Sequence, residues 1–229
     1  MQGSSRHWLW WCWLLVALAP GPLQAEENVA PGINRHYENP DFEQWRGTFE
    51  QSGREVYARR MDILAASALR PGMAVADIGA GSGLFTLLFA REVGEQGRVY
   101  AVDIAPEFVA GIEARARAEG RGNVVGVVSE QRSTRLAPGS IDLAFVCDTY
   151  HHFEYPQAML ASIHQALRPG GRLIIIDFRR ETGLSSSWVL GHVRAGEAQV
   201  IAEVTAAGFA LSAQPDLLRS NYFLTFTRH

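Results

Sequence analysis

The chain has 229 residues, 47% of them hydrophobic and 20% charged, with 22 glycines and 10 prolines. This composition excludes wholesale disorder and collagen-like repeats, and the length predicts one domain with a large core. The formal net charge of -3 excludes a global positive field that would gather nucleic acid or anionic lipid. It does not exclude a local basic groove.

Residues 1–25 differ in composition from the rest of the chain. Arg6 and His7 precede an apolar run over residues 8–19, a Pro-Gly-Pro sequence ends the run, and Ala25 offers a small residue for cleavage. This order is typical of a secretory signal peptide. The alternative is an uncleaved membrane anchor, but a run of about 12 residues is short for a spanning helix, which needs about 20. We expect cleavage, a periplasmic or secreted protein, and no stable membrane insertion afterwards.

The cysteine content is low. Cys12 lies in the leader, and its removal would leave Cys147 alone. The mature chain could then form no internal disulfide, and it lacks the several thiolates of a soft-metal site.

Strands and helices are predicted to alternate after the leader and a polar, aromatic segment. A helix over 56–69 ends at a Pro-Gly pair, and a strand over 73–77 then leads through a glycine turn into a helix over 84–93. The further predicted strands are 98–103, 124–128, 141–147, 172–177, 209–213 and 222–227, and the further helices are 106–119, 156–167 and 197–207. This alternation predicts a doubly wound, Rossmann-like α/β fold with a mostly parallel sheet.

The polar and aromatic segment over residues 26–55 is the exception to this pattern. Tyr37, Phe42, Trp45 and Phe49 are spaced for a short amphipathic helix. The segment is either a surface helix that caps the fold or a lid over a binding site. The predicted organisation is therefore a leader (1–25), a helical lid segment (26–55) and one α/β domain (56–229).

The glycine-rich sequence after the first predicted strand is the strongest functional signal. Asp77 precedes a loop in which Gly79, Gly81 and Gly83 alternate with small residues, and a helix follows. Glycines allow a tight turn and the close approach of a ligand to the backbone. A dinucleotide fingerprint needs its third glycine one place later, where Leu84 stands, so this pattern argues against a nicotinamide cofactor.

A carboxylate at the end of the second predicted strand extends this signal. Asp103 follows Gly83 by twenty residues, at a position where a carboxylate can accept hydrogen bonds from two ribose hydroxyls. Glycine loop and acid together indicate a nucleoside-containing ligand. The alternatives are that the loop only turns the chain, that Asp77 caps it, and that Asp103 caps the helix beginning at Pro106.

From about residue 56 to residue 228 the sequence resembles the class I S-adenosylmethionine-dependent methyltransferases. The resemblance rests on the glycine loop, on Asp103, and on two segments that look like the family's leads into strands four and five, residues 137–143 and 167–173. It implies a seven-stranded sheet whose final strand is antiparallel, and S-adenosyl-L-methionine as cofactor. The residues it implies around that cofactor are Asp77, Gly79, Ala80, Gly81, Gly83, Asp103, Ile104, Glu130 and Asp148.

In the family's pattern, Asp103 holds the ribose and Ile104 packs beside the adenine. Glu130, in a Ser-Glu pair where relatives often carry Gly-Asp or Ala-Asp, would contact the adenine amino group through a side chain one methylene longer. Asp77 and the glycines would shape the pocket for the methionine portion.

The sequence after the fourth predicted strand carries the candidate catalytic groups. The resemblance places Asp148, Tyr150, His151 and His152 beside the methyl group to be transferred, and small-molecule methyltransferases of the family frequently have a His-His pair here. A histidine could remove a proton from a hydroxyl or ammonium acceptor at neutral pH, whereas a thiolate or carbanion needs no base. One histidine could equally hydrogen-bond the loop backbone.

Two further classes of ligand are considered. No metal is expected, because neighbouring histidines rarely face one ion and no third ligand is identifiable. Nucleic acid is not expected either, since the Asn/Asp-Pro-Pro-Tyr/Phe sequence of DNA amino-methylating enzymes is absent and the pI is about 6.2. After the fifth strand, His192 and Arg194 could touch an anionic acceptor, but an ordinary helix start explains them equally well.

The sequence therefore predicts an S-adenosylmethionine-dependent methyltransferase with a small-molecule acceptor and an oligomeric state that the sequence does not define. The alternative is an exported protein that binds S-adenosylmethionine or its product without catalysis. Turnover of the methyl group separates the two hypotheses.

Overall fold

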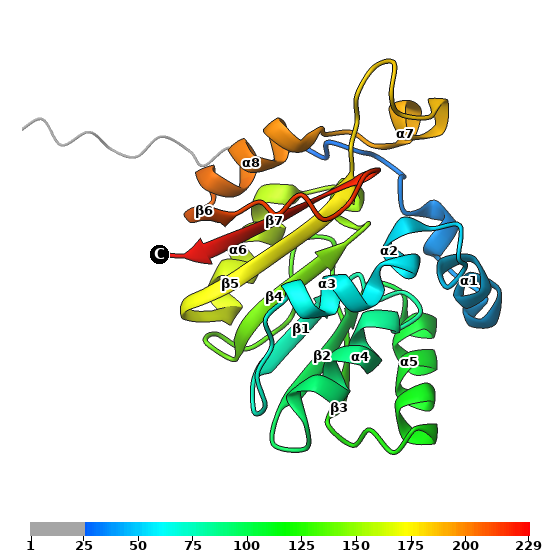
Figure 1. The fold of residues 1–229 in the computed structure, drawn as a ribbon, viewed down its shortest axis with the longest axis vertical. Helices are drawn as coiled ribbons and strands as arrows, with labels where there is room; N and C mark the ends of the chain where they lie inside the picture. Colours follow the sequence, from blue (N-terminus) through cyan, green and yellow to red (C-terminus); the bar gives the residue numbers. More distant parts are fainter. Residues whose placement is uncertain (1–25) are drawn as a thin grey trace, which may run out of the picture.

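The computed structural model describes residues 26–229 (Figure 1). The predicted signal peptide lies outside the described residues, so its cleavage stays a prediction. Among the residues described, no helix is both long and apolar enough to cross a membrane.

Seven strands form a single sheet in the order β3-β2-β1-β4-β5-β7-β6. Strand β7 runs antiparallel to both of its neighbours, and the remaining pairs are parallel. The predicted Rossmann-like sheet with an antiparallel final strand is confirmed. The bounds are β1 Ala74–Ile78, β2 Arg98–Asp103, β3 Val124–Val128, β4 Ile141–Cys147, β5 Leu167–Phe178, β6 Phe209–Ala213 and β7 Asn221–Arg228.

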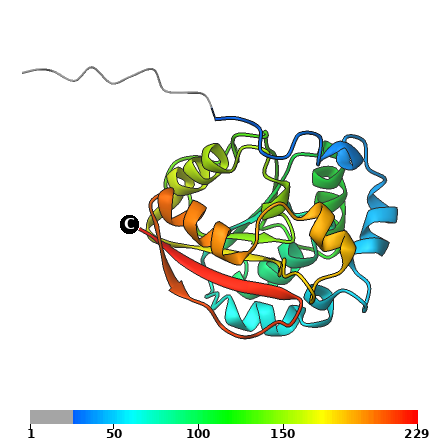
Figure 2. The ribbon, with the colours of Figure 1, turned by 90° about the horizontal axis from the view of Figure 1, so that it is seen from above.

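Helices cover both faces of the sheet, as the view from above shows (Figure 2). Helices α6 and α8 pack on one face, and α3 and α4 on the other, each over its own cluster of buried apolar side chains. Strands β1 and β4 are apolar apart from Asp77 and Asp142, because both of their faces are buried. The bounds are α1 Phe42–Phe49, α2 Glu55–Ala58, α3 Arg60–Ala66, α4 Leu84–Val93, α5 Pro106–Ala118, α6 Pro156–Ala166, α7 Ser187–His192 and α8 Glu197–Ala206, with 3-10 turns η1 Arg35–Tyr37 and η2 Tyr150–His152.

The helix predicted over 56–69 is two short helices in the structure. They meet at Arg59, whose φ of -99° and ψ of 15° are not helical. The break lets Val56 on α2 and both Ile63 and Leu64 on α3 reach the core. Helix α7 was not predicted as a complete element, and it begins where the Ser186 side chain accepts a hydrogen bond from the Val189 amide.

The segment over residues 26–55 crosses the edge of the sheet at which the parallel strands end. The Glu26 carboxylate accepts from the amides of Gln157 and Ala158 at 2.7 and 2.8 Å, at the N-terminus of α6, where negative charge is favoured. Further along, Arg115 on α5 donates to Glu50 at 2.6 Å. Tyr37 lies on η1 and so outside α1, where the other three predicted aromatic residues stand.

Candidate active site

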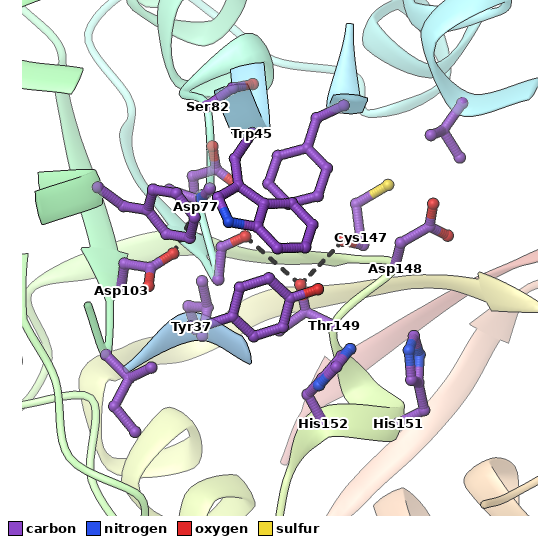
Figure 3. Close-up of a pocket in the computed structure, with 18 of the residues that line it drawn as sticks. Tyr37, Trp45, Asp77, Ser82, Asp103, Cys147, Asp148, Thr149, His151 and His152 are labelled. Carbon is purple, nitrogen blue, oxygen red and sulfur yellow. Dashed lines mark hydrogen bonds between the residues drawn. The ribbon is translucent and has the colours of Figure 1, made fainter. Parts of the chain in front are cut away.

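The carboxyl ends of β1, β2, β4 and β5 open into one cavity of about 490 Å³, which α1 and α7 also line (Figure 3). Parallel strands bring their carboxyl ends to the same edge of a sheet, and ligands of open α/β sheets bind in the crevice there. The cavity has two ends that differ in chemistry, one made by the glycine loop and β2, the other by histidines.

The glycine loop follows β1 without a break. Gly79, Gly81 and Gly83 have φ values of 71°, 54° and 78°, a backbone region that side chains other than glycine rarely adopt. A Cβ on Gly79 would lie 2.2 Å from Cγ2 of Thr149, and one on Gly83 would lie 2.9 Å from Cγ1 of Ile112. The loop therefore packs against the chain behind it and presents its backbone to the cavity.

Two buried carboxyl groups support this loop. Asp77 accepts a 2.6 Å hydrogen bond from the Thr86 hydroxyl, and its burial raises its pKa to about 7. Asp103 accepts from the Gly81 amide at 2.9 Å and from the Ala105 amide at 3.0 Å, and burial raises its pKa to about 6. The link from Asp103 to Gly81 was not foreseen, and it means that the strand-end acid also fixes the shape of the glycine loop.

Aromatic side chains close the cavity above the loop. Tyr37 and Trp45 lie 4.8 Å apart between ring centroids, and Phe49 lies 5.2 Å from Trp45 and 6.1 Å from Phe108. In Figure 3, Tyr37 and Trp45 stand together over the cavity. The lid segment thus supplies part of the cavity wall, and Ile104 lines the cavity beside Phe108.

The adenine contact expected of Glu130 stays a prediction, because its carboxylate already has a partner. Residue 130 lines the cavity, but its carboxylate forms an ion pair with Arg135 and its side chain is 55% exposed. Ala80 lines the same end of the cavity as Asp103.

Asp148, directly after β4, is held in place by two side-chain partners. Its side chain accepts from Arg54 at 2.5 Å and from the Asn221 amide group at 2.6 Å, and its backbone has a φ of 48°. Burial raises its pKa to about 6, although the Arg54 charge acts in the opposite direction. Neither partner was predicted, because both come from segments far from Asp148 in the sequence and neither belongs to a recognisable pattern.

The position of Tyr150 corrects the prediction that it is a catalytic residue. Its side chain is fully buried and does not line the cavity, and its hydroxyl donates to Glu203 on α8 at 2.7 Å. Glu203 in turn accepts two hydrogen bonds from Arg194, at 2.9 and 2.8 Å. Successive residues of a 3-10 turn point about 120° apart, so Tyr150 of η2 can face the core while His151 and His152 line the cavity. Arg194 is held by its hydrogen bonds to Glu203 and does not line the cavity either.

Three histidines meet at the other end of the cavity. His151 and His152 come from η2 and His192 comes from the last residue of α7, and their nearest ring nitrogens all lie within 4.8 Å of one another. The sequence offered no third ligand for a metal, whereas the structure brings the His192 imidazole beside the neighbouring pair. His192 had been considered only as an acceptor contact.

The imidazoles differ in their electrostatic surroundings. Burial disfavours the charged form of His151, but the charge and hydrogen bond of Asp177 together raise its pKa above the ordinary value. Burial, His151 and His192 lower the pKa of His152 to about 2, and burial together with His151 lowers that of His192. Asp177, the penultimate residue of β5, was not predicted because in the sequence it looks like an ordinary strand residue.

The glycine end of the cavity fits a nucleoside with an attached chain. Asp103 keeps acceptor capacity on both oxygens beyond its two backbone hydrogen bonds, the glycine loop leaves no side chain between ligand and backbone, and aromatic rings face the same space. Fold and cavity together place the protein in the Rossmann-like class of α/β proteins, whose ligands bind at this edge of the sheet.

Comparison with known proteins agrees with this class and defines it more closely. Residues 76–175 match the model of a methyltransferase domain family. A ubiquinone/menaquinone biosynthesis C-methyltransferase UbiE of Hydrogenovibrio crunogenus is 31% identical over 117 residues, which cover 51% of this chain and 46% of that protein. The chain thus spans about half the length of the curated relatives it matches.

Solved structures share the fold over most of the chain. A SAM dependent methyltransferase from Aquifex aeolicus matches with a TM-score of 0.74 and 24% identity over 83% of this chain and all of that one. A protein from Bordetella parapertussis described as a possible exported protein matches with a TM-score of 0.63 and 18% identity, over 84% of this chain and 80% of that one. The domain match and the shared fold support the class I S-adenosylmethionine-dependent methyltransferase family, the enzyme class and the cofactor, S-adenosyl-L-methionine, that the sequence predicted.

Proposed function

We propose that this protein transfers a methyl group from S-adenosylmethionine to a small-molecule acceptor by in-line displacement. The observation that carries the proposal is one continuous cavity with a glycine cradle and Asp103 at one end and three imidazoles at the other. A ligand held at the first end can present a reactive group to a second molecule at the other.

The residues of the cradle act by positioning. When bound, S-adenosylmethionine supplies an electrophilic methyl group. Asp103 accepts hydrogen bonds from ribose hydroxyls, the backbone of the glycine loop contacts the attached chain, and the rings of Tyr37 and Trp45 exclude water from above. Holding the two reactants in line supplies most of the acceleration in a displacement of this kind.

The acceptor end favours a small, flat and largely apolar molecule. Phe178 and Trp188 line it with His192, and the full cavity of about 490 Å³ must hold both reactants. The name of the UbiE relative supports carbon as the methylated atom. An acceptor that must first lose a proton needs a base or a metal ion, and the lone pairs of the histidine cluster can serve either role.

Calorimetric titration tests the cofactor assignment. We expect binding of S-adenosylmethionine and S-adenosylhomocysteine but not of NADH, and we expect Asp103→Asn to weaken binding by about 1–3 kcal/mol because a charged acceptor is lost. The Asn side chain keeps one acceptor oxygen, so one of the two backbone amides that Asp103 binds, Gly81 or Ala105, retains its partner. Unchanged affinity in this variant, or NADH binding, would contradict the assignment.

Methyl transfer is then followed with a labelled methyl group and a set of phenolic, quinol and amine acceptors. Label in any acceptor supports the enzyme. Tight binding of both adenosyl ligands with no transfer to any of them favours the alternative, a protein that binds these ligands without catalysis.

We also propose that the protein is exported and loses residues 1–25. The order of charged, apolar and small residues in this segment supports export, as does the fold similarity to the possible exported protein from Bordetella parapertussis. Mass spectrometry of the protein from separated cell fractions measures this directly. An intact N-terminus in the membrane fraction would indicate an anchor, and an intact N-terminus in the cytoplasmic fraction would contradict export.

A further inference from the structure

The three histidines at the acceptor end are arranged as ligands around a common point. Nε2 of His152 and Nε2 of His192 lie 3.5 Å apart, and no pair in the cluster exceeds 4.8 Å. Four-coordinate zinc with bonds of about 2.1 Å places its nitrogen ligands roughly 3.4 Å apart. The His152–His192 pair already has this spacing, and the ligand nitrogen of His151 lies within 4.8 Å of both.

The outer nitrogens of two of the rings are already bound by oxygen. Nδ1 of His151 lies 2.8 Å from Oδ1 of Asp177, and Nδ1 of His152 lies 3.2 Å from Oδ1 of Asn34. Metal-binding histidines almost always donate their other ring N–H to a carboxylate, a carbonyl or water, which fixes the tautomer. The cluster has this second set of contacts in place.

The amide of Asn34 shows which nitrogen of His152 carries the proton. Its Nδ2 donates to the carbonyl of His152 at 3.1 Å and to Glu154 at 3.3 Å, so its Oδ1 must face the ring as an acceptor. Nδ1 of His152 is therefore the donor, and Nε2 keeps its lone pair. The Asp177 carboxylate imposes the same tautomer on His151.

The third ring is held by stacking. Trp188 lies parallel to His192 at 4.7 Å between centroids and an angle of 22°. Nε2 of His152 thus keeps its lone pair beside two further imidazoles at a cavity wall that aromatic rings also line, and a cation is a partner that three imidazoles can bind together.

We propose that His151, His152 and His192 bind one divalent transition-metal ion of the zinc type. Three imidazoles leave the fourth position open, as in catalytic zinc sites, and that position faces the cavity that the glycine loop also lines. The ligand for it is an oxygen or sulfur donor of the acceptor molecule. This role for the ion depends on the proposed methyl transfer, whereas metal binding itself does not.

The test is metal titration of the untagged full-length protein after removal of metals with a chelator. We expect one Zn²⁺ per chain, measured by competition with a chromogenic chelator, and ligand-field absorption when Co²⁺ is used instead. His192→Ala removes a ligand from a half-buried position and should weaken Zn²⁺ binding at least 100-fold. Asn34→Ala removes the oxygen that faces Nδ1 of His152, together with the amide bonds to the His152 carbonyl and Glu154, but it removes no ligand, so it should weaken Zn²⁺ binding about 10- to 100-fold.

His164→Ala is the matched control, because His164 lies on α6 outside the cluster and its loss should leave Zn²⁺ affinity unchanged. Circular dichroism verifies that each variant is folded. Failure of the folded wild type to bind Zn²⁺ overturns the proposal, and so does equal affinity in wild type and His192→Ala. Titration of the same samples with S-adenosylhomocysteine separates the two proposals, since retained binding of that ligand without Zn²⁺ binding overturns only the metal site.

Discussion

The two ends of the cavity are built in opposite ways. At the glycine end, one unbroken stretch from β1 to α4 supplies the loop, and Asp103 from the neighbouring strand β2 completes it. At the histidine end, η2, β5, α7 and the N-terminal segment each contribute one or two side chains. The first end presents mainly backbone, and the second presents mainly side chains held by other side chains.

The two ends should therefore be sensitive to different kinds of substitution. A surface made of backbone depends on torsion angles and on the absence of side chains, so a single methyl group can destroy it. A surface made of converging side chains depends on partners that orient them. Changes at the two ends should therefore differ in kind as well as in size.

The largest effect is expected at Gly79. Gly79→Ala would place a Cβ 2.2 Å from Thr149 in a backbone with φ of 71°, so we expect loss of at least 100-fold in S-adenosylhomocysteine affinity and lower stability. Gly170→Ala is the matched control, because its φ is 73° and nothing lies within 4 Å of the added Cβ. It should cost only about 1–2 kcal/mol of unfolding free energy. Calorimetry and thermal unfolding measure both, and equal effects in the two variants would refute the steric argument.

A pH-dependent effect is expected at Asp77. Its pKa of about 7 in the folded chain lies above the ordinary value of 3.8, so between these pH values the folded state binds more protons than the unfolded state. The unfolding free energy therefore falls as pH rises through this window. Asp77→Asn should be more stable than wild type above pH 7, by about 1–3 kcal/mol, and equal to it near pH 4.

Thermal unfolding at pH 4 and pH 8 measures this difference. Asp216→Asn provides the control, since Asp216 is exposed and its neutralisation should change stability little at either pH. Greater stability of wild type than of Asp77→Asn at pH 8 would reverse the predicted sign.

The smallest effect is expected at Tyr150. Tyr150→Phe removes the hydrogen bond to Glu203 and should lower the unfolding free energy by about 1–2 kcal/mol, with S-adenosylhomocysteine affinity unchanged. Tyr222→Phe is the matched control, because the buried Tyr222 hydroxyl has no hydrogen-bond partner among the described residues. That variant should be neutral or more stable. A fall in ligand affinity or methyl transfer in the folded Tyr150→Phe variant would indicate that Tyr150 contacts the reacting molecules after all.

The strands and most helices could be predicted from the sequence because their signals are local. Apolar runs with the lengths of buried strands, and the glycines and prolines between them, place β2, β3, β4, β6 and α4 at the bounds the structure shows. The interruption at Arg59 could not be predicted, since it depends on how α2 and α3 both reach the core.

The glycine end of the cavity could be predicted from the sequence alone. A loop whose function is carried by its backbone needs glycines close together in the sequence, and a strand-end acid follows a short distance along the chain, so both signals can be recognised without the tertiary structure. The arrangement of the histidine end became visible only in the tertiary structure. Tyr150 and His151 are neighbours in sequence, yet one points into the core and the other into the cavity, and His192 joins them across forty residues. Side chains meet there because helices and strands pack in three dimensions, and no local pattern records that meeting.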